Sequence, residues 1–237
     1  MKFSLALAAL AGLEVTAFGR PSTGVQPRAE GTITYVDQET GFTFSEYKAA
    51  FSLSANIVFR FALPSNAPSG PYNTVIQAVV PNQLGWIGLA WGGNMVRNPL
   101  TVAYPNGQKA TVSSRWATGH STPGAYTGAT YTLLNTGNKV NGSHWQFTAK
   151  CAGCTTWTGT SGSVRISPTG SSRLAFAYST GKAASPSSNT STIPVHDTPN
   201  YFTNDFSLGQ NPNFDALLQR NGISAASDGV VFVDGPL

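Results

Sequence analysis

Short apolar stretches bounded by Gly, Pro, Asn or Ser recur along the whole 237-residue sequence. This pattern is the feature that most limits the fold. The stretches have the length and spacing of strands rather than helices. Several alternate in polarity, for example residues 56–63 (NIVFRFAL), as expected for a sheet that faces water on one side. The sequence therefore predicts an all-β fold, an antiparallel β-sandwich with immunoglobulin-like layers and at most one short C-terminal helix.

The pattern also places the elements along the chain. The one expected helix covers residues 213–221, where the spacing of Asp and Leu suits two turns. The Ser-rich stretch 181–192 has no periodicity and predicts a long loop, which in a small domain is often functional. The expected strands are 32–36, 51–63, 72–80, 86–91, 100–104, 109–115, 130–134, 144–149, 163–166, 174–179 and 229–233.

Composition excludes several classes of protein. Only 10% of the residues are charged and 41% are hydrophobic, which is unlike a disordered acidic tail or a coiled coil. The net charge of +4 comes from basic residues that are scattered singly. Nucleic-acid binding needs such residues clustered on one face, so no nucleic-acid partner is predicted.

The N-terminus has the features of a secretory signal. Lys2 precedes an apolar run that ends at Leu13, and Gly19 follows in a small-residue context, so we expect a signal peptide over 1–19. A flexible leader is expected over 20–31 and one domain over 32–237. No later run reaches the roughly 20 apolar residues of a membrane span. We therefore expect a secreted, extracellular monomer, with glycosylation possible at the sequons of Asn141 and Asn189.

Common hydrolytic chemistries lack their signatures in this sequence. The acidic residues form no recognisable glycosidase pair, and no G-x-S-x-G turn supports a Ser-His-Asp triad. A copper monooxygenase of the secreted kind would need a mature N-terminal histidine, whereas Arg20 is expected there. Cys151 and Cys154 are the only cysteines, and in a secreted chain they most simply form a disulfide that closes a small loop.

The remaining candidate ligands are soft or nitrogenous. Met95 is the only methionine besides Met1, and it follows Trp91-Gly-Gly at the end of a predicted strand, where glycines allow a sharp turn or close approach to a flat ligand. His196 follows the Ser-rich stretch between Pro194 and Pro199, which restrict the backbone. From the residues alone, Met95 could equally be core packing and His196 a structural histidine.

Six motifs in order resemble a known family, the secreted fungal cytochrome domain of cellobiose dehydrogenase, from about residue 32 to about residue 218. They are 86–95 (WIGLAWGGNM), 102–107 (VAYPNG), 112–119 (VSSRWATG), 144–147 (HWQF), 151–157 (CAGCTTW) and His196-Asp197. The resemblance implies a DOMON-type sandwich that holds one haem b non-covalently, with Met95 and His196 as the axial iron ligands. It makes Trp91, Tyr104, Trp116 and His120 further candidates for the haem surround.

A Met/His pair implies electron transfer, because it fills both axial positions and raises the reduction potential. The resemblance therefore implies redox partner proteins: a flavoenzyme or small reductant as donor, and a copper monooxygenase, ferric iron or a quinone as acceptor. Iron reductase activity is one possibility. No sugar dehydrogenase activity is expected from this chain alone, because it shows no flavin-binding G-x-G-x-x-G fingerprint.

The sequence departs from the family at His120, where the family has a tyrosine next to a haem propionate. An imidazole there would couple the haem potential to pH in the range where histidine titrates. Two other functions remain open. One is a DOMON module that binds a carbohydrate or cell-wall glycan without haem, through exposed aromatics such as Trp86 or Trp157. The other is a secreted structural or effector-like surface protein.

Overall fold

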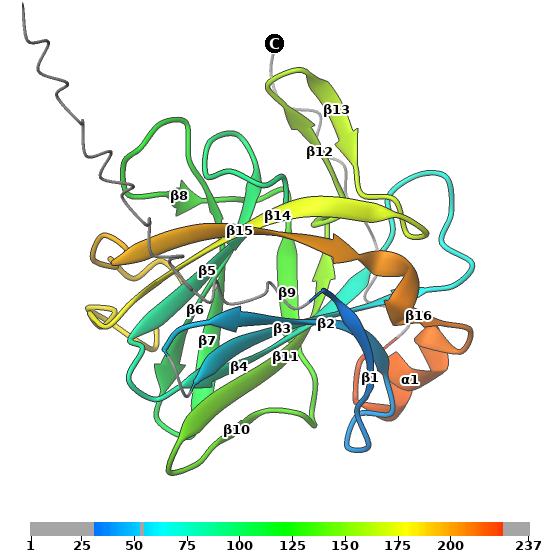
Figure 1. The fold of residues 1–237 in the computed structure, drawn as a ribbon, viewed down its shortest axis with the longest axis horizontal. Helices are drawn as coiled ribbons and strands as arrows, with labels where there is room; N and C mark the ends of the chain where they lie inside the picture. The colour runs from blue at the N-terminus through cyan, green and yellow to red at the C-terminus, as the bar shows by residue number, and fades with distance from the viewer. Residues whose placement is uncertain (1–30, 53–54, 225–237) are drawn as a thin grey trace, which may run out of the picture.

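Two antiparallel sheets pack face to face in the computed structural model, which describes residues 31–52 and 55–224 (Figure 1). The first sheet has the order β1 (Ile33–Val36), β2 (Thr43–Ala50), β3 (Asn56–Pro64), β4 (Thr74–Pro81), β11 (His144–Ala152) and β10 (Lys139–Val140), with β9 (Thr130–Leu133) beside β11 and β16 (Gln210–Asn211) parallel to β3. The predicted antiparallel β-sandwich is confirmed.

The second sheet carries the features that matter for function. Its order is β15 (Thr198–Asp205), β14 (Ser171–Ser179), β5 (Trp86–Ala90), β6 (Pro99–Asn106), β7 (Lys109–Trp116) and β8 (Gly124–Ala125). A separate hairpin joins β12 (Thr156–Gly159) to β13 (Gly162–Arg165). After β15 the chain forms the 3-10 turn η1 (Phe206–Gly209), β16 and the helix α1 (Phe214–Arg220). This helix confirms the one expected over residues 213–221, and no described helix is long and apolar enough to cross a membrane.

Large side chains from both sheets fill the space between them. Phe59 of β3 meets Phe176 of β14 with ring centroids 5.7 Å apart, and Phe61 contacts Trp91 edge-on at 5.5 Å. Ile87 and other inward residues complete this fully buried layer. Because successive side chains of a strand point to opposite faces, the residues between these large ones lie on the outer faces of the sheets.

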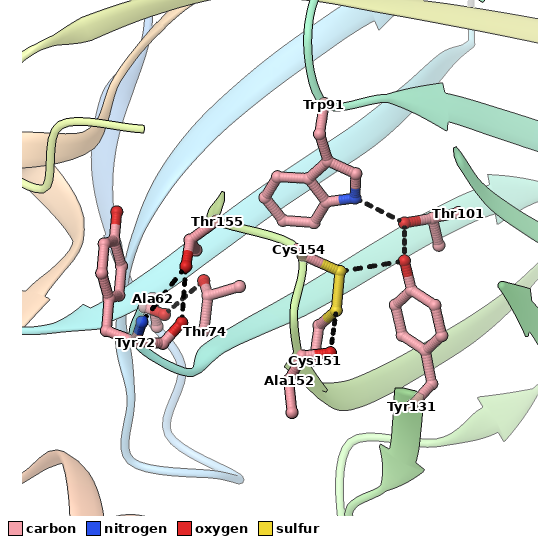
Figure 2. Close-up of a disulfide and its surroundings, with 10 residues drawn as sticks. All are labelled: Ala62, Tyr72, Thr74, Trp91, Thr101, Tyr131, Cys151, Ala152, Cys154 and Thr155. Carbon is pink, nitrogen blue, oxygen red and sulfur yellow. Dashed lines mark hydrogen bonds between the residues drawn. A yellow bond between two sulfur atoms is a disulfide. The ribbon is translucent and has the colours of Figure 1, made fainter. Parts of the chain in front are cut away.

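The disulfide joins the core at the end of β11 (Figure 2). Cys151 and Cys154 are fully buried, and Cys154 Sγ lies 3.1 Å from Tyr131 Oη. Thr101 Oγ1 bonds that phenol and accepts a hydrogen bond of 2.9 Å from Trp91 Nε1. Burial raises the pKa of Tyr131 to about 12, so the phenol stays protonated. The predicted disulfide is confirmed, and it belongs to the hydrophobic core rather than to a surface turn.

Several strand predictions needed correction. β2 and β15 were missed because their sequences, TFSEYKAA and TPNYFTND, are rich in polar residues. In β2 the acidic Glu46 is nevertheless buried, because Arg60 Nε lies 2.6 Å from its carboxylate. The strand predicted over 51–63 begins only at Asn56, since Phe51 lies in the β2–β3 turn. The predicted signal peptide, nearly all of the leader and the strand over 229–233 lie outside the described residues.

The aromatic side chains packed between the two sheets should contribute most to the free energy of unfolding of the sandwich. We expect Phe61→Ala to lower the free energy of unfolding by about 3–5 kcal/mol, because this fully buried ring contacts both Trp91 and Phe206. Urea unfolding measures the change. The control Val36→Ala, at a half-exposed position of the edge strand β1, should stay within about 0.5 kcal/mol of the wild type. Equal effects of the two substitutions would contradict the packing described.

Candidate functional site

A cavity of about 500 Å³ lies on the outer face of the second sheet. Strands β5, β6, β14 and β15 contribute its base, and three loops contribute its sides. These are the Met95 loop (residues 91–98), the His120 loop (117–123) and the Ser-rich loop (180–197). The volume lies within the usual range of about 300–1,000 Å³ for cofactor and ligand sites.

The base of this cavity is made of unusually small residues. Gly88 and Ala90 of β5 are paired across the sheet with Ala177 and Ala175 of β14. All four residues line the cavity, and a Cβ added at Gly88 would lie only 3.2 Å from Cζ3 of Trp86. The indole ring of Trp86 therefore lies close over Gly88. At these four positions the strands turn small residues outward while large ones point into the core, and apart from the indole of Trp86 this leaves a shallow base that suits a flat molecule.

The sides of the cavity are largely apolar. Leu100 and Val102 project from β6, and Ile193 comes from the Ser-rich loop. Two exposed apolar residues lie at the cavity: the side chain of Val195 is 83% exposed and that of Tyr201 is 51% exposed. The guanidinium of Arg173 lies 4.1 Å from the centroid of the Tyr201 ring. The site therefore favours a ligand that is mostly apolar.

Met95 and His196 both line this cavity. Met95 lies in the loop between β5 and β6, and His196 lies just before β15, so the second sheet brings together two residues from distant parts of the chain. Both side chains are half-buried. Sequence reasoning thus identified two residues that the fold places in one cavity rather than in separate regions.

The Ser-rich loop is fixed along its length by donors from β6 and β7. Four of its backbone carbonyls, those of residues 186, 188, 189 and 191, accept hydrogen bonds. The donors are Thr111 Oγ1 (2.5 Å), the Tyr104 hydroxyl, the Ser113 hydroxyl and Arg115 Nη2 (2.7 Å), respectively. A second guanidinium nitrogen of the buried Arg115 donates to the carbonyl of Pro123 in the His120 loop. One buried cation therefore links two of the three loops around the cavity.

Asp197 holds the end of the Ser-rich loop against β14. Its carboxylate accepts hydrogen bonds from the backbone N–H of Thr180 (2.7 Å) and the hydroxyl of Ser179 (2.9 Å), while its own N–H donates to the carbonyl of Tyr178 (2.8 Å). The Thr180 N–H, followed by the Ser179 hydroxyl, keeps the pKa of Asp197 below its ordinary value. The backbone next to His196 is thereby held, and among the described residues the buried Nδ1 of His196 has no hydrogen-bond partner.

His120 lines the same cavity from the loop that follows β7, on an exposed stretch of chain. The other three candidates for the surround lie elsewhere. Trp91 faces the core between the sheets, where its indole donates to Thr101. Tyr104 is buried beneath the Ser-rich loop, and Trp116 stacks on Tyr126 at 4.8 Å, outside the residues that line the cavity.

Sequence reasoning missed the base of the cavity and misjudged two aromatics. Small residues two apart in β5 (Gly88, Ala90) and in β14 (Ala175, Ala177) were a readable signal, because such residues share one face of a strand. The expectation that Trp86 and Trp157 are exposed was wrong, since both are 5% exposed. The two sequon residues, Asn141 and Asn189, are exposed, and their glycosylation stays a prediction.

Comparisons with known proteins point to one family. Residues 35–216 match the family model "Cytochrome domain of cellobiose dehydrogenase". A curated pyrroloquinoline quinone-dependent pyranose dehydrogenase of Coprinopsis cinerea is 33% identical over 195 residues. That match covers 81% of this chain but only 26% of the relative, so the chain spans about a quarter of the length of that curated protein.

Two solved structures share the fold. The cytochrome b domain of the Coprinopsis cinerea pyranose dehydrogenase superposes with a TM-score of 0.69 at 29% identity, covering 79% of this chain and 94% of that one. The cytochrome domain of Myriococcum thermophilum cellobiose dehydrogenase superposes with a TM-score of 0.71 at 22% identity, covering 81% and 97% of the two chains.

The small residues at the base of the cavity lead to a prediction about haem binding. A leucine at Ala177 would project into the cavity, and we expect Ala177→Leu to weaken haem binding by roughly tenfold or more while the sandwich stays folded. Spectrophotometric titration of the protein with haem measures this affinity. Ala125→Leu, at an exposed position of β8 outside the cavity, is the matched control. Wild-type affinity in Ala177→Leu would contradict the assignment of the cavity.

Proposed function

The chain belongs to the family of the cytochrome domain of cellobiose dehydrogenase, and on this premise we propose that it is a secreted haem b protein that transfers single electrons between redox partners. The family itself implies a haem b cofactor and electron transfer. The proposal adds the residues that hold the haem, the partners and the extracellular location. The observation that carries it is that Met95 and His196 line the same cavity.

The residues of the cavity fit a haem. A thioether and an imidazole are a known axial pair for haem iron, and these are the side chains that the cavity brings together. The small residues of β5 and β14 suit a flat macrocycle, and the apolar sides suit its hydrocarbon surface. The buried Nδ1 of His196 has no hydrogen-bond partner within residues 31–52 and 55–224, so no contact from this part of the chain competes for that nitrogen. We therefore assign Met95 and His196 as the axial ligands.

Met95 and His196 would hold the haem, which would supply one-electron transfer with a potential raised by the thioether. The chain's own residues bind, orient and shield it. The hydrogen bonds of Asp197 fix the backbone beside His196. The apolar side chains of Leu100, Val102 and Ile193 line the cavity and shield the haem from water. Val195 and Tyr201, which are exposed at the cavity, leave a surface at which a partner can approach.

The proposed donors are a secreted flavoenzyme or a small reductant, and the proposed acceptors are a copper monooxygenase, ferric iron or a quinone. The curated relative adds a dehydrogenase that depends on pyrroloquinoline quinone as a further donor to test. Stopped-flow mixing of the haem-loaded chain with each reduced candidate measures the rate of electron transfer. A donor is supported if it reduces the protein within seconds and excluded if reduction is no faster than with buffer.

A module that binds glycans without haem is less well supported. That function relied on exposed aromatics at Trp86 or Trp157, whereas Trp157 is buried outside the cavity and Trp86, although it lines the cavity, is only 5% exposed. Trp157 also donates a hydrogen bond from its indole N–H to the buried Asn98, so this N–H already has a partner within the protein.

The axial assignment predicts the spectra of two variants. Met95→Ala and His196→Ala should each abolish the low-spin, six-coordinate haem spectrum, because each removes one axial ligand, while the far-UV circular dichroism of the sandwich stays unchanged. Optical spectra of the oxidised and reduced proteins measure the change. His144→Ala is the control, because His144 is outside the residues that line the cavity. A low-spin spectrum that persists in both ligand variants would contradict the assignment.

His120 predicts a pH dependence of the potential. A positive imidazolium at the cavity favours the reduced haem, which carries one positive charge less, so the potential should be higher with a charged His120 than with a neutral one and should fall as pH rises. Spectroelectrochemistry between pH 5 and 8 measures the slope, which we expect to disappear in His120→Phe. The hypothesis fails if the wild type shows no slope, or if His120→Phe keeps the same one.

A further inference from the structure

Asn98 belongs to the Met95 loop, and its side chain forms hydrogen bonds to the residues on both sides of Met95. Its Nδ2 donates hydrogen bonds to the carbonyl of Asn94 (3.1 Å), the side-chain oxygen of Asn94 (3.0 Å) and the carbonyl of Val96 (2.9 Å). Asn94 and Val96 are the two residues that flank Met95. The side chain of Asn98 is 6% exposed, and this amide therefore fixes the backbone immediately before and after the thioether.

Trp157 fixes the orientation of that amide. Its Nε1 donates a hydrogen bond of 3.1 Å to Oδ1 of Asn98, from strand β12 in a separate hairpin. An indole N–H can donate but cannot accept, so it must face the oxygen of the amide. The NH2 group of Asn98 is consequently directed at the oxygens of the Met95 loop. The bond between Trp157 and Asn98 is buried and those to the Met95 loop are part-buried, so an unmet polar group on Asn98 would be costly.

Two further residues of the Met95 loop, Gly92 and Arg97, have backbones that their surroundings constrain. A Cβ at Gly92 would lie 1.7 Å from Oδ1 of Asn98 and 2.9 Å from Cζ2 of Trp157, so only glycine fits there. On its other side the loop is held by the N–H of Arg97, which donates to the carbonyl of Ala117 (2.8 Å). Arg97 adopts a left-handed backbone with φ +55°, which a non-glycine residue takes up only where its surroundings hold it.

We propose that Asn98 and Trp157 are positioning residues that hold the Met95 thioether in one orientation at the cavity. The proposal rests on the function proposed above, in which Met95 ligates the haem iron. Neither residue lines the cavity, so both act through the loop rather than on the cofactor. A methionine side chain is unbranched and flexible, and a fixed backbone at its two neighbours limits the positions that its sulfur can reach.

Two conservative variants separate this role from simple packing. Asn98→Asp keeps the shape and the oxygen that faces Trp157, but it replaces the donating NH2 with an acceptor that faces the oxygens of residues 94 and 96. Trp157→Phe removes the indole N–H and keeps an aromatic ring. Trp145→Phe is the matched control, because it removes another buried indole N–H, which donates to the carbonyl of Leu84 outside the Met95 loop.

The first measurement uses the full chain without haem and follows oxidation of Met95 by hydrogen peroxide, read by mass spectrometry. Met95 is the only methionine besides Met1, so the signal is unambiguous. Because one buried hydrogen bond shifts a local equilibrium by a modest factor, we expect Asn98→Asp and Trp157→Phe to speed oxidation roughly two- to tenfold. Trp145→Phe should match the wild type. Urea unfolding of each variant shows that the change is local.

The second measurement uses the haem-loaded chain and follows its midpoint potential. A loosened thioether stabilises ferrous iron less, so the potential should fall in Asn98→Asp and Trp157→Phe and stay unchanged in Trp145→Phe. Wild-type oxidation rates and potentials in either test variant would overturn the proposal. If Met95→Ala itself keeps the wild-type spectrum and potential, the ligand assignment fails, and the oxidation rates still decide whether Asn98 and Trp157 hold the loop.

Discussion

The cavity depends on the alternation of side chains along two adjacent strands. In β5 and β14 the inward positions carry Ile87, Leu89, Leu174 and Phe176, which fill the space between the sheets. The four outward positions between them, Gly88, Ala90, Ala175 and Ala177, carry glycine or alanine. Since a strand must send successive side chains to opposite faces, one stretch of sequence builds both the hydrophobic core and an empty, shallow surface. Larger outward residues would close the site without disturbing the core.

The loops over that surface are ordered by polar contacts as well as by the apolar packing of Ala183 and Ile193. Donors from β6 and β7 fix the carbonyls of the Ser-rich loop, Asp197 ties its end to β14, and Asn98 fixes the Met95 loop from within. The contacts of Asn98 end at the carbonyls on either side of Met95, and the N–H of Asp197, next to His196, donates to the carbonyl of Tyr178. The scaffold can therefore present a thioether and an imidazole from distant segments in a fixed relation, as fast electron transfer with little structural change requires. A rigid site of this kind also accounts for the long Ser-rich stretch, whose composition alone predicted only a loop.

Sequence reasoning found the sandwich, the helix and the disulfide from local patterns, and it proposed Met95 and His196 as ligands from the resemblance of their motifs to the family. It missed β2 and β15, whose buried polar residues are explained only by partners elsewhere, such as Arg60 for Glu46. It expected Trp157 to be an exposed aromatic, whereas the fold buries that indole against Asn98, 59 positions away in the sequence. Contacts of that range cannot be read from periodicity. The small outward residues of β5 and β14 were readable, but only a pairing of the two strands makes them a surface.

The central claim is that one sulfur and one imidazole nitrogen ligate the same iron. Iron K-edge X-ray absorption of the haem-loaded chain tests it most directly, because sulfur and nitrogen scatter differently. The account predicts six-coordinate iron with one sulfur ligand among nitrogens. Coordination by nitrogen alone, as would arise if His120 rather than Met95 bound opposite His196 in the same cavity, would contradict it.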